Sequence, residues 1–140
     1  RVYVGDQTDT NFLKKVISQT GKPDIIIDDG GHTSKQQITS FNYLFSYLNE
    51  EGTYLVEDTH TSYNKNFQDR ADNLTFIEFA KSLTDEINDW YRQYDYKIFK
   101  KNISNTNVSF WAKFLYSVSF YNSIVSFVKK RNKIPRCELR

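Results

Sequence analysis

Short apolar runs alternate with helix-like repeats over most of the chain. The β-branched and aromatic run at residues 1–5 predicts a strand. A helix is predicted to begin at Asp9 or Thr10 and to end at Gly21. Residues 25–27 are isoleucines without polar alternation, which predicts a parallel strand covered on both faces. The beginning of the chain therefore reads as strand, helix and strand joined by short connections.

The same alternation continues beyond His32. Thr33 or Ser34 is expected to cap a second helix, whose apolar residues recur at three- and four-residue spacing so that one face packs on the sheet. Gly52 precedes a predicted strand at residues 53–56. The apolar positions of the second helix are Ile38, Phe41, Leu44, Phe45 and Leu48.

The remaining pattern predicts a loop, a long helix and a hairpin. Residues 59–73 are polar and aperiodic, which favours a lid or substrate loop. A helix is predicted at residues 74–92, whereas residues 94–114 show no clear pattern. The apolar runs at 116–120 and 124–128 predict an antiparallel hairpin. The fold class is therefore α/β, with parallel strands and helices followed by an antiparallel hairpin.

Composition narrows the class of protein. The 140 residues make one domain or part of one, which we divide into residues 1–133 and a basic tail at 134–140. A net charge of +2 gives no strong case for nucleic acid or membrane as a partner. Cys137 has no second cysteine to pair with, and nothing resembles a signal peptide or a membrane span. We expect a cytoplasmic protein.

Acids and histidines follow two of the predicted strands. Asp28 and Asp29 come directly after the isoleucine strand, and Glu57 and Asp58 come directly after the predicted strand at residues 53–56. Neighbouring parallel strands present such groups at one edge of the sheet. Carboxylate oxygens are suited to Mg²⁺, so Asp29, Glu57 and Asp58 are the predicted ligands. Glu57 and Asp58 would point in opposite directions in an extended strand, so the chain must bend for both to bind.

His32 lies in the same loop as Asp29 and is the candidate general base. The alternatives are structural. Asp28 and Asp29 could form a turn and cap the next helix, and Asp28 in particular is either structural support or a cofactor contact. His60 is a loop hydrogen-bonding residue or a substrate contact, and Tyr63 either orients the substrate or anchors its loop.

Three sequence blocks carry a family resemblance. They run from Gly5 to Asp9, from Asp24 to His32 and from Glu57 to Tyr63, and their order and spacing resemble the macrolide-sugar O-methyltransferases typified by the mycinamicin and macrocin enzymes. These are class I S-adenosylmethionine-dependent methyltransferases with a Rossmann-like fold.

The resemblance implies specific roles. The family places its metal carboxylates and its catalytic histidine at positions that match Asp29, Glu57, Asp58 and His32. It suggests cofactor contacts at Asp6 and Gln7, for which a helix-entry turn is the alternative, and Asp28 is added as a third candidate. The implied cofactors are S-adenosylmethionine and Mg²⁺, and the implied acceptor is a hydroxyl of a sugar or glycosylated small molecule.

One departure from the family concerns the cofactor. A complete domain of this kind opens with a strand and a Gly-rich loop for the methionine portion, then a strand ending in an acid for the ribose. The chain shows neither, so we expect the C-terminal portion of such a domain, without its first two strands and with an incomplete cofactor site. The rival interpretations are a metal-dependent hydrolase or hydroxylase and a non-catalytic remnant of the fold. The acceptor's identity and a homo-oligomeric state are left open.

Overall fold

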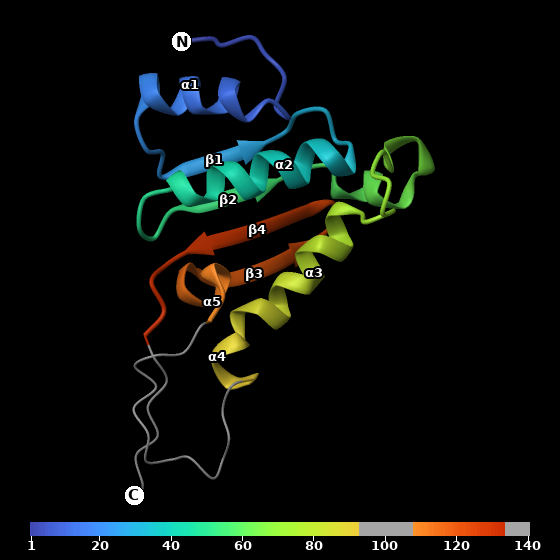
Figure 1. The fold of residues 1–140 in the computed structure, drawn as a ribbon. Helices are drawn as coiled ribbons and strands as arrows, with labels where there is room; N and C mark the ends of the chain where they lie inside the picture. The colour runs from blue at the N-terminus through green and yellow to red at the C-terminus, as the bar shows by residue number, and fades with distance from the viewer. Residues whose placement is uncertain (93–107, 134–140) are drawn as a thin grey trace, which may run out of the picture.

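The structure is a computed structural model that describes residues 1–92 and 108–133. The predicted basic tail at 134–140 and most of residues 94–114, which show no clear pattern, lie outside these residues. In the described part, four strands form one mixed sheet in the order β1-β2-β4-β3 (Figure 1). They are β1 (Ile25–Asp28), β2 (Thr53–Val56), β3 (Leu115–Tyr121) and β4 (Ile124–Lys129).

Only β1 and β2 are parallel. Strand β4 runs antiparallel to both β2 and β3. The sheet thus combines a parallel pair with an antiparallel hairpin, which confirms the predicted α/β class and the hairpin. Because β1 and β2 pair in register from Ile25 opposite Thr53 to Asp28 opposite Val56, their carboxyl ends finish side by side.

Local signals in the sequence explain where the first two helices begin. The Asp9 carboxylate accepts a hydrogen bond from the Asn11 backbone N–H at the start of α1 (Thr10–Thr20). At the start of α2 (Ser34–Leu44), Thr33 and Gln36 form a reciprocal capping box. A short 3-10 helix, η1 (Phe45–Tyr47), extends α2. The predicted caps are therefore confirmed.

The other helices are α3 (Phe76–Ile87), α4 (Asp89–Arg92) and α5 (Phe110–Phe114). The prediction of a single helix at residues 74–92 is wrong, because the helix is interrupted at Asn88, between α3 and α4. Two 3-10 helices, η2 (Thr59–Tyr63) and η3 (Lys65–Phe67), occupy much of the segment expected to be an aperiodic loop. None of the helices in the described residues is long and apolar enough to cross a membrane.

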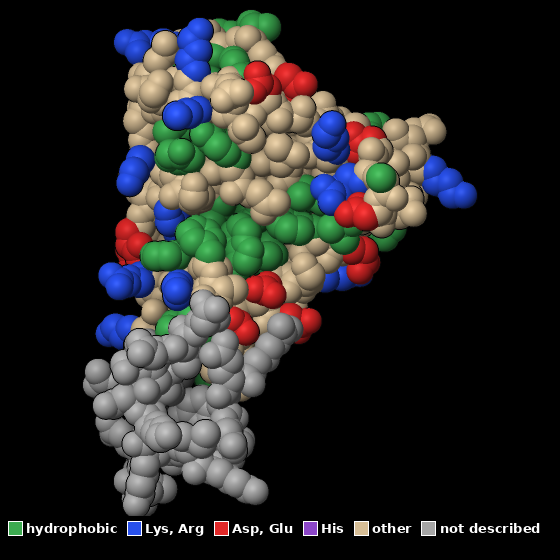
Figure 2. Space-filling model, in the orientation of Figure 1, with side chains coloured by type: hydrophobic (Ala, Val, Ile, Leu, Met, Phe, Trp, Pro, Cys, Tyr) green, Lys and Arg blue, Asp and Glu red, His purple; other side chains and the backbone are tan. Residues whose placement is uncertain are grey.

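Helices α2 and α3 cover one face of the sheet, and an aromatic core fills the space between the two layers (Figure 1). Phe41 of α2 packs edge-on against Tyr54 of β2, with ring centroids 5.1 Å apart, and it also contacts Phe127 of β4. Figure 2 shows hydrophobic side chains reaching the surface between α2 and α3. The core therefore fixes α2, and the loop that precedes it, against the ends of β1 and β2.

Two strand predictions fail in the described structure. Residues 1–5 form no strand, and Val2 and Val4 are about 90 % exposed. The isoleucine strand exists, but it is not covered on both faces, since Ile25 and Ile27 are 64 % and 58 % exposed. Alternate residues of a strand face opposite sides, and α2 and α3 pack only on the side of Ile26 and Asp28.

Candidate metal and base site

The loop between β1 and α2 carries the Asp-Asp-Gly-Gly-His run. Its two glycines allow a glutamine to approach closely: the Gly31 N–H donates to Gln7 Oε1 at 2.8 Å, and a β-carbon at Gly30 would lie 2.1 Å from the same oxygen. His32 adopts a left-handed backbone with φ of 59°, which turns the chain into the capped start of α2. Non-glycine residues in this region are uncommon and often occur at functional sites.

The loop after β2 contains a second left-handed residue. Asp58 has φ of 51°, which supplies the bend that the sequence required at this position. The Thr61 hydroxyl lies 2.9 Å from the carbonyl oxygen of His32 and 2.8 Å from that of Asp58. Thr61 therefore ties the two loops together at the carboxyl edge of the parallel pair.

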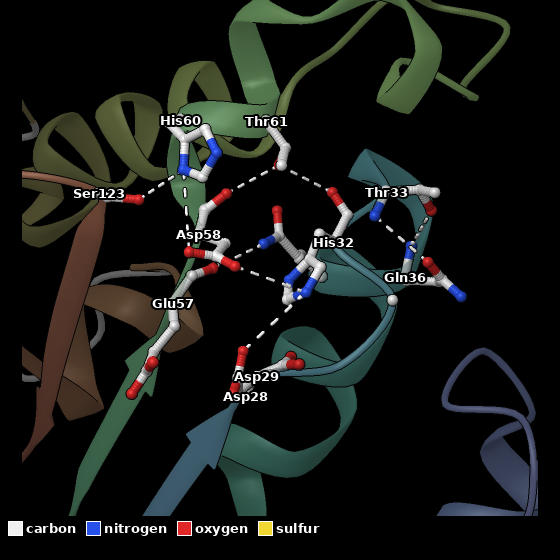
Figure 3. Close-up of polar contacts among 12 residues, drawn as sticks. Asp28, Asp29, His32, Thr33, Gln36, Glu57, Asp58, His60, Thr61 and Ser123 are labelled. Atoms are coloured by element: carbon white, nitrogen blue, oxygen red, sulfur yellow. Dashed lines mark hydrogen bonds and ion pairs between the residues drawn. The ribbon is translucent and has the colours of Figure 1, made fainter.

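Asp29, His32 and Asp58 converge at this edge (Figure 3). His32 Nε2 lies 3.9 Å from Asp29 Oδ1 and 3.6 Å from Asp58 Oδ2, and one ligand atom of each residue falls within 4.8 Å of the others. The imidazole is mostly buried, whereas both carboxylates are about half exposed. The structure thus brings together two carboxylates and one imidazole at a position open to a small ligand.

Glu57 is not brought into this group. In Figure 3 its carboxylate points away from His32. Its backbone is held on both sides, since the Glu57 N–H donates to the Asp28 carbonyl oxygen at 3.0 Å and its own carbonyl oxygen accepts from Gln37 Nε2 at 3.1 Å. Only rotation of the side chain would add its carboxylate to the cluster, so its role as a metal ligand stays a prediction.

Asp28 is buried in a network of its own. Its carboxylate accepts hydrogen bonds from Tyr54 OH at 3.0 Å, from Gln7 Nε2 at 3.2 Å and from the Ser40 hydroxyl. Burial, followed by the negative charge of Asp28, raises the pKa of Tyr54 well above its ordinary value. Asp28 therefore has the structural role that was one of its two alternatives, and a cofactor contact stays a prediction.

The side chains of Asp6 and Gln7, which were predicted to contact the cofactor, point in different directions. Asp6 is exposed, and hydrogen bonds from the backbone and hydroxyl of Thr8 lower the pKa of its carboxyl group. This arrangement is the helix-entry turn that was the alternative interpretation. Gln7 points inward, where its amide links the Asp28 network to the backbone of Gly31.

His60 and Tyr63 lie on η2, beside the cluster. His60 Nδ1 is 2.7 Å from Ser123 Oγ in the β3–β4 turn and 3.8 Å from Asp58 Oδ1 (Figure 3). Its imidazole is mostly exposed, so it is both a loop hydrogen-bonding residue and accessible to a ligand. Tyr63 is 76 % exposed. A substrate contact by either residue stays a prediction.

Gln37 is a site residue that sequence reasoning missed. It is 1 % exposed and lies on the buried face of α2, where it supports the backbone of Glu57. Its spacing of four residues from Phe41 was the available signal, because it places a polar side chain on the face that packs against the sheet. The sequence could not show which backbone group this side chain would reach.

Open α/β sheets bind their ligands at the carboxyl ends of parallel strands, and in this chain Asp29, His32 and Asp58 lie at that edge. No protein-family profile matches the chain. The chain does match curated proteins. It is 43 % identical over 84 residues to an 8-demethyl-8-alpha-L-rhamnosyl tetracenomycin-C 2'-O-methyltransferase of Streptomyces olivaceus. It is also 38 % identical over 91 residues to mycinamicin VI 2''-O-methyltransferase of Micromonospora griseorubida.

These matches cover 59 % and 62 % of this chain but only 22 % and 23 % of the relatives, so the chain spans about a fifth of their length. Among solved structures, MycE methyltransferase in complex with Mg and SAH aligns with a TM-score of 0.78 at 28 % identity, over 97 % of this chain and 34 % of MycE. MycE with Mg, SAH and mycinamycin VI aligns with a TM-score of 0.70.

The chain is therefore related in sequence and in fold to the macrolide-sugar O-methyltransferases, and the predicted family resemblance is confirmed. The fold matches part of the Rossmann-like fold of MycE.

Proposed function

We propose that the protein containing this chain is a Mg²⁺-dependent S-adenosylmethionine O-methyltransferase that methylates a sugar hydroxyl of a glycosylated small molecule. The observation that carries the proposal is the convergence of Asp29, His32 and Asp58 at the carboxyl ends of β1 and β2. The named relatives support it, because they methylate sugar hydroxyls, and MycE was solved with Mg and SAH.

The donor set fits Mg²⁺. This cation prefers carboxylate oxygens and leaves positions for water or substrate. Among the described residues, no N–H or O–H group donates a hydrogen bond to the carboxylate of Asp29 or Asp58, and each carboxylate faces only histidine. We assign Glu57 as the third ligand, reached by a side-chain rotation. When bound, Mg²⁺ would orient the acceptor hydroxyl and make it a stronger acid.

His32 is then the general base. Its Nε2 faces both carboxylates and removes the proton of the acceptor hydroxyl as that oxygen attacks the donor's methyl carbon. The new carbon–oxygen bond forms as the carbon–sulfur bond breaks, and the electron pair of that bond returns the sulfonium to a neutral thioether. We further propose that His60, whose Nδ1 lies 3.8 Å from Asp58 Oδ1, contacts the sugar, and that the exposed Tyr63 of the same short helix is a second substrate contact.

The test is transfer of a labelled methyl group from S-adenosylmethionine to rhamnosylated and mycinamicin-type acceptors by the protein that contains this chain. We expect transfer that stops with a chelator, is restored by Mg²⁺, and falls by at least about a hundredfold in His32→Ala. Asp24→Asn, which alters an acid at the opposite end of β1, is the matched control and should retain activity. Transfer that is independent of Mg²⁺ or unaffected by His32→Ala would contradict the proposal.

A further inference from the structure

His32 is held in its left-handed backbone conformation by side chains from outside its loop. Its φ of 59° is sparsely populated by residues other than glycine and persists only where the surroundings fix it. On one side, the Gly31 N–H donates to Gln7 Oε1 at 2.8 Å. On the other, the Thr33 N–H donates to Gln36 Oε1 at 3.2 Å (Figure 3). Two side-chain amides therefore enclose the residue that carries the imidazole of the site.

The bond to Gln36 is part of the helix that follows. Gln36 and Thr33 form the capping box that begins α2, a motif that depends only on neighbouring residues. Gln7, in contrast, lies 24 residues before Gly31, ahead of α1. The start of α1 is capped by Asp9, so neither helix requires the Gln7 amide for its cap. The bond from Gly31 to Gln7 therefore serves the loop itself.

The Gln7 amide is anchored in the interior of the fold. Its Nε2 donates to Asp28 Oδ1 at 3.2 Å and lies 3.3 Å from Ser40 Oγ. Asp28 and Ser40 are 8 % and 2 % exposed, so packing fixes both acceptors. Because both hydrogens of Nε2 have partners, the amide oxygen is held toward Gly31, and the side chain has no free N–H for a cofactor.

The two glycines of the run provide the space that these contacts need. A β-carbon at Gly30 would lie 2.1 Å from Gln7 Oε1. A β-carbon at Gly31 would lie 2.1 Å from Gln36 Oε1. Gly30 and Gly31 therefore let two amide side chains reach the backbone on either side of His32, because a glycine allows close approach.

We infer that Gln7 is a positioning residue for His32 and Asp29. By holding the Gly31 N–H, it fixes the loop that carries both side chains, in the geometry that places His32 Nε2 3.9 Å from Asp29 Oδ1. This role rests on the proposed function, in which His32 is the base and Asp29 a metal ligand. It differs from the cofactor contact that the family resemblance suggests for Gln7, because the amide acts on the loop and not on a ligand.

The test compares three variants of the protein that contains this chain. Gln7→Met removes the amide at similar volume. Gly30→Ala leaves the glutamine in place and displaces its oxygen from the Gly31 N–H, because the added methyl group would lie 2.1 Å from that oxygen. Ser40→Ala is the matched control, since it weakens the same Asp28 network but leaves the bond between Gln7 and Gly31.

Two measurements require no reaction. In hydrogen-exchange mass spectrometry, the Gly31 amide should exchange about fivefold faster or more in Gln7→Met and Gly30→Ala, as expected for the loss of one hydrogen bond. In a ¹H–¹³C spectrum of ring-labelled histidine, the signal of His32, assigned with His32→Ala, should move in the same two variants. Both observations should match the unaltered protein in Ser40→Ala.

Methyl transfer supplies a third measurement. In Gln7→Met, kcat should fall by about 10–100-fold while the KM for S-adenosylmethionine is retained, because groups that orient the residues of a site change activity by this amount when they are removed. Ser40→Ala should retain kcat. A raised KM with unchanged kcat in Gln7→Met would overturn the inference in favour of a cofactor contact.

Unchanged Gly31 exchange or an unmoved His32 signal in Gln7→Met, or equal changes in Ser40→Ala, would also overturn it. If Gln7→Met fails to fold, Gly30→Ala is judged by the same results. Absence of methyl transfer by the unaltered protein, together with the expected exchange and His32 signals, would contradict the proposed function and support the positioning of the loop. Transfer that is unaffected in both Gln7→Met and Gly30→Ala would overturn this inference alone.

Discussion

Asp28 and Asp29 are adjacent in the sequence and have opposite environments. Asp28 is 8 % exposed, and its carboxylate accepts from three side chains. The Asp29 side chain is 60 % exposed, and it lies 3.9 Å from the imidazole of His32. The first carboxylate holds the structure together, whereas the second faces solvent and His32, as the proposed metal site requires.

The period of the strand produces this difference. Asp28 is the last residue of β1 and points to the face covered by α2, where Tyr54 and Ser40 meet it. Asp29 is the first residue beyond the strand, at the edge where Asp58 also lies. Two consecutive acids at a strand end can therefore differ, with one carboxylate bonded within the fold and the other left accessible at the edge of the sheet.

The largest expected effect concerns Asp28, the buried acid of the pair. Asp28→Ala should lower the free energy of unfolding by about 3 kcal/mol, because it leaves Tyr54 OH, Gln7 Nε2 and the Ser40 hydroxyl without their shared acceptor. Urea denaturation followed by circular dichroism measures this change. A loss below about 1 kcal/mol would mean that the network does little to hold the fold.

The next prediction concerns Asp29, the exposed acid of the pair. Asp29→Asn should weaken Mg²⁺ binding by about tenfold or more, which is about 1.4 kcal/mol, and should change the free energy of unfolding by less than about 0.5 kcal/mol. The Mg²⁺-dependent rise in melting temperature reports the binding. Asp24→Asn, with the same change of charge at the other end of β1, should retain the rise. Equal effects of the two variants would remove the distinction between Asp29 and an ordinary surface acid.

A smaller effect concerns the hydrogen bond from Tyr54 to Asp28 and the dependence of stability on pH. Tyr54→Phe should lower the free energy of unfolding by about 1 kcal/mol at neutral pH, since one hydrogen bond to Asp28 is lost. The raised pKa of Tyr54 means that the folded state keeps this proton where the unfolded state loses it. The stabilisation that protonated Tyr54 contributes is present below about pH 10, the pKa of a tyrosine in the unfolded chain, and it is lost as the pH rises above that value. Urea midpoints from pH 8 upward should fall less steeply in Tyr54→Phe, and parallel curves would contradict this reasoning.

Local pattern and strand topology predicted much of the fold and part of the site. The cap at Thr33 and the hairpin of β3 and β4 depend on a few neighbouring residues, and they were predicted correctly. The convergence of Asp29 with Asp58 followed from the parallel pairing of two strands. These features require only local chemistry and one rule of topology.

The remaining features depend on partners that a local pattern does not contain. The exposure of Ile25 and Ile27 depends on which elements pack on each face of the sheet, and periodicity does not specify this. The direction of the Glu57 side chain depends on the left-handed turn at Asp58 and on the backbone contact with Gln37. The inward direction of Gln7 depends on its approach to Gly31 across the fold.

The central claim is that Asp29, His32 and Asp58 form one ligand site. Titration of the ¹⁵N-labelled chain with Mg²⁺, followed by backbone amide chemical shifts, tests it most directly. We predict that the signals of these three residues shift together and saturate on one binding curve, while that of Lys129 at the opposite end of the sheet does not move. Shifts that do not saturate, or that centre on other surface acids such as Asp69 and Asp72, would contradict the account.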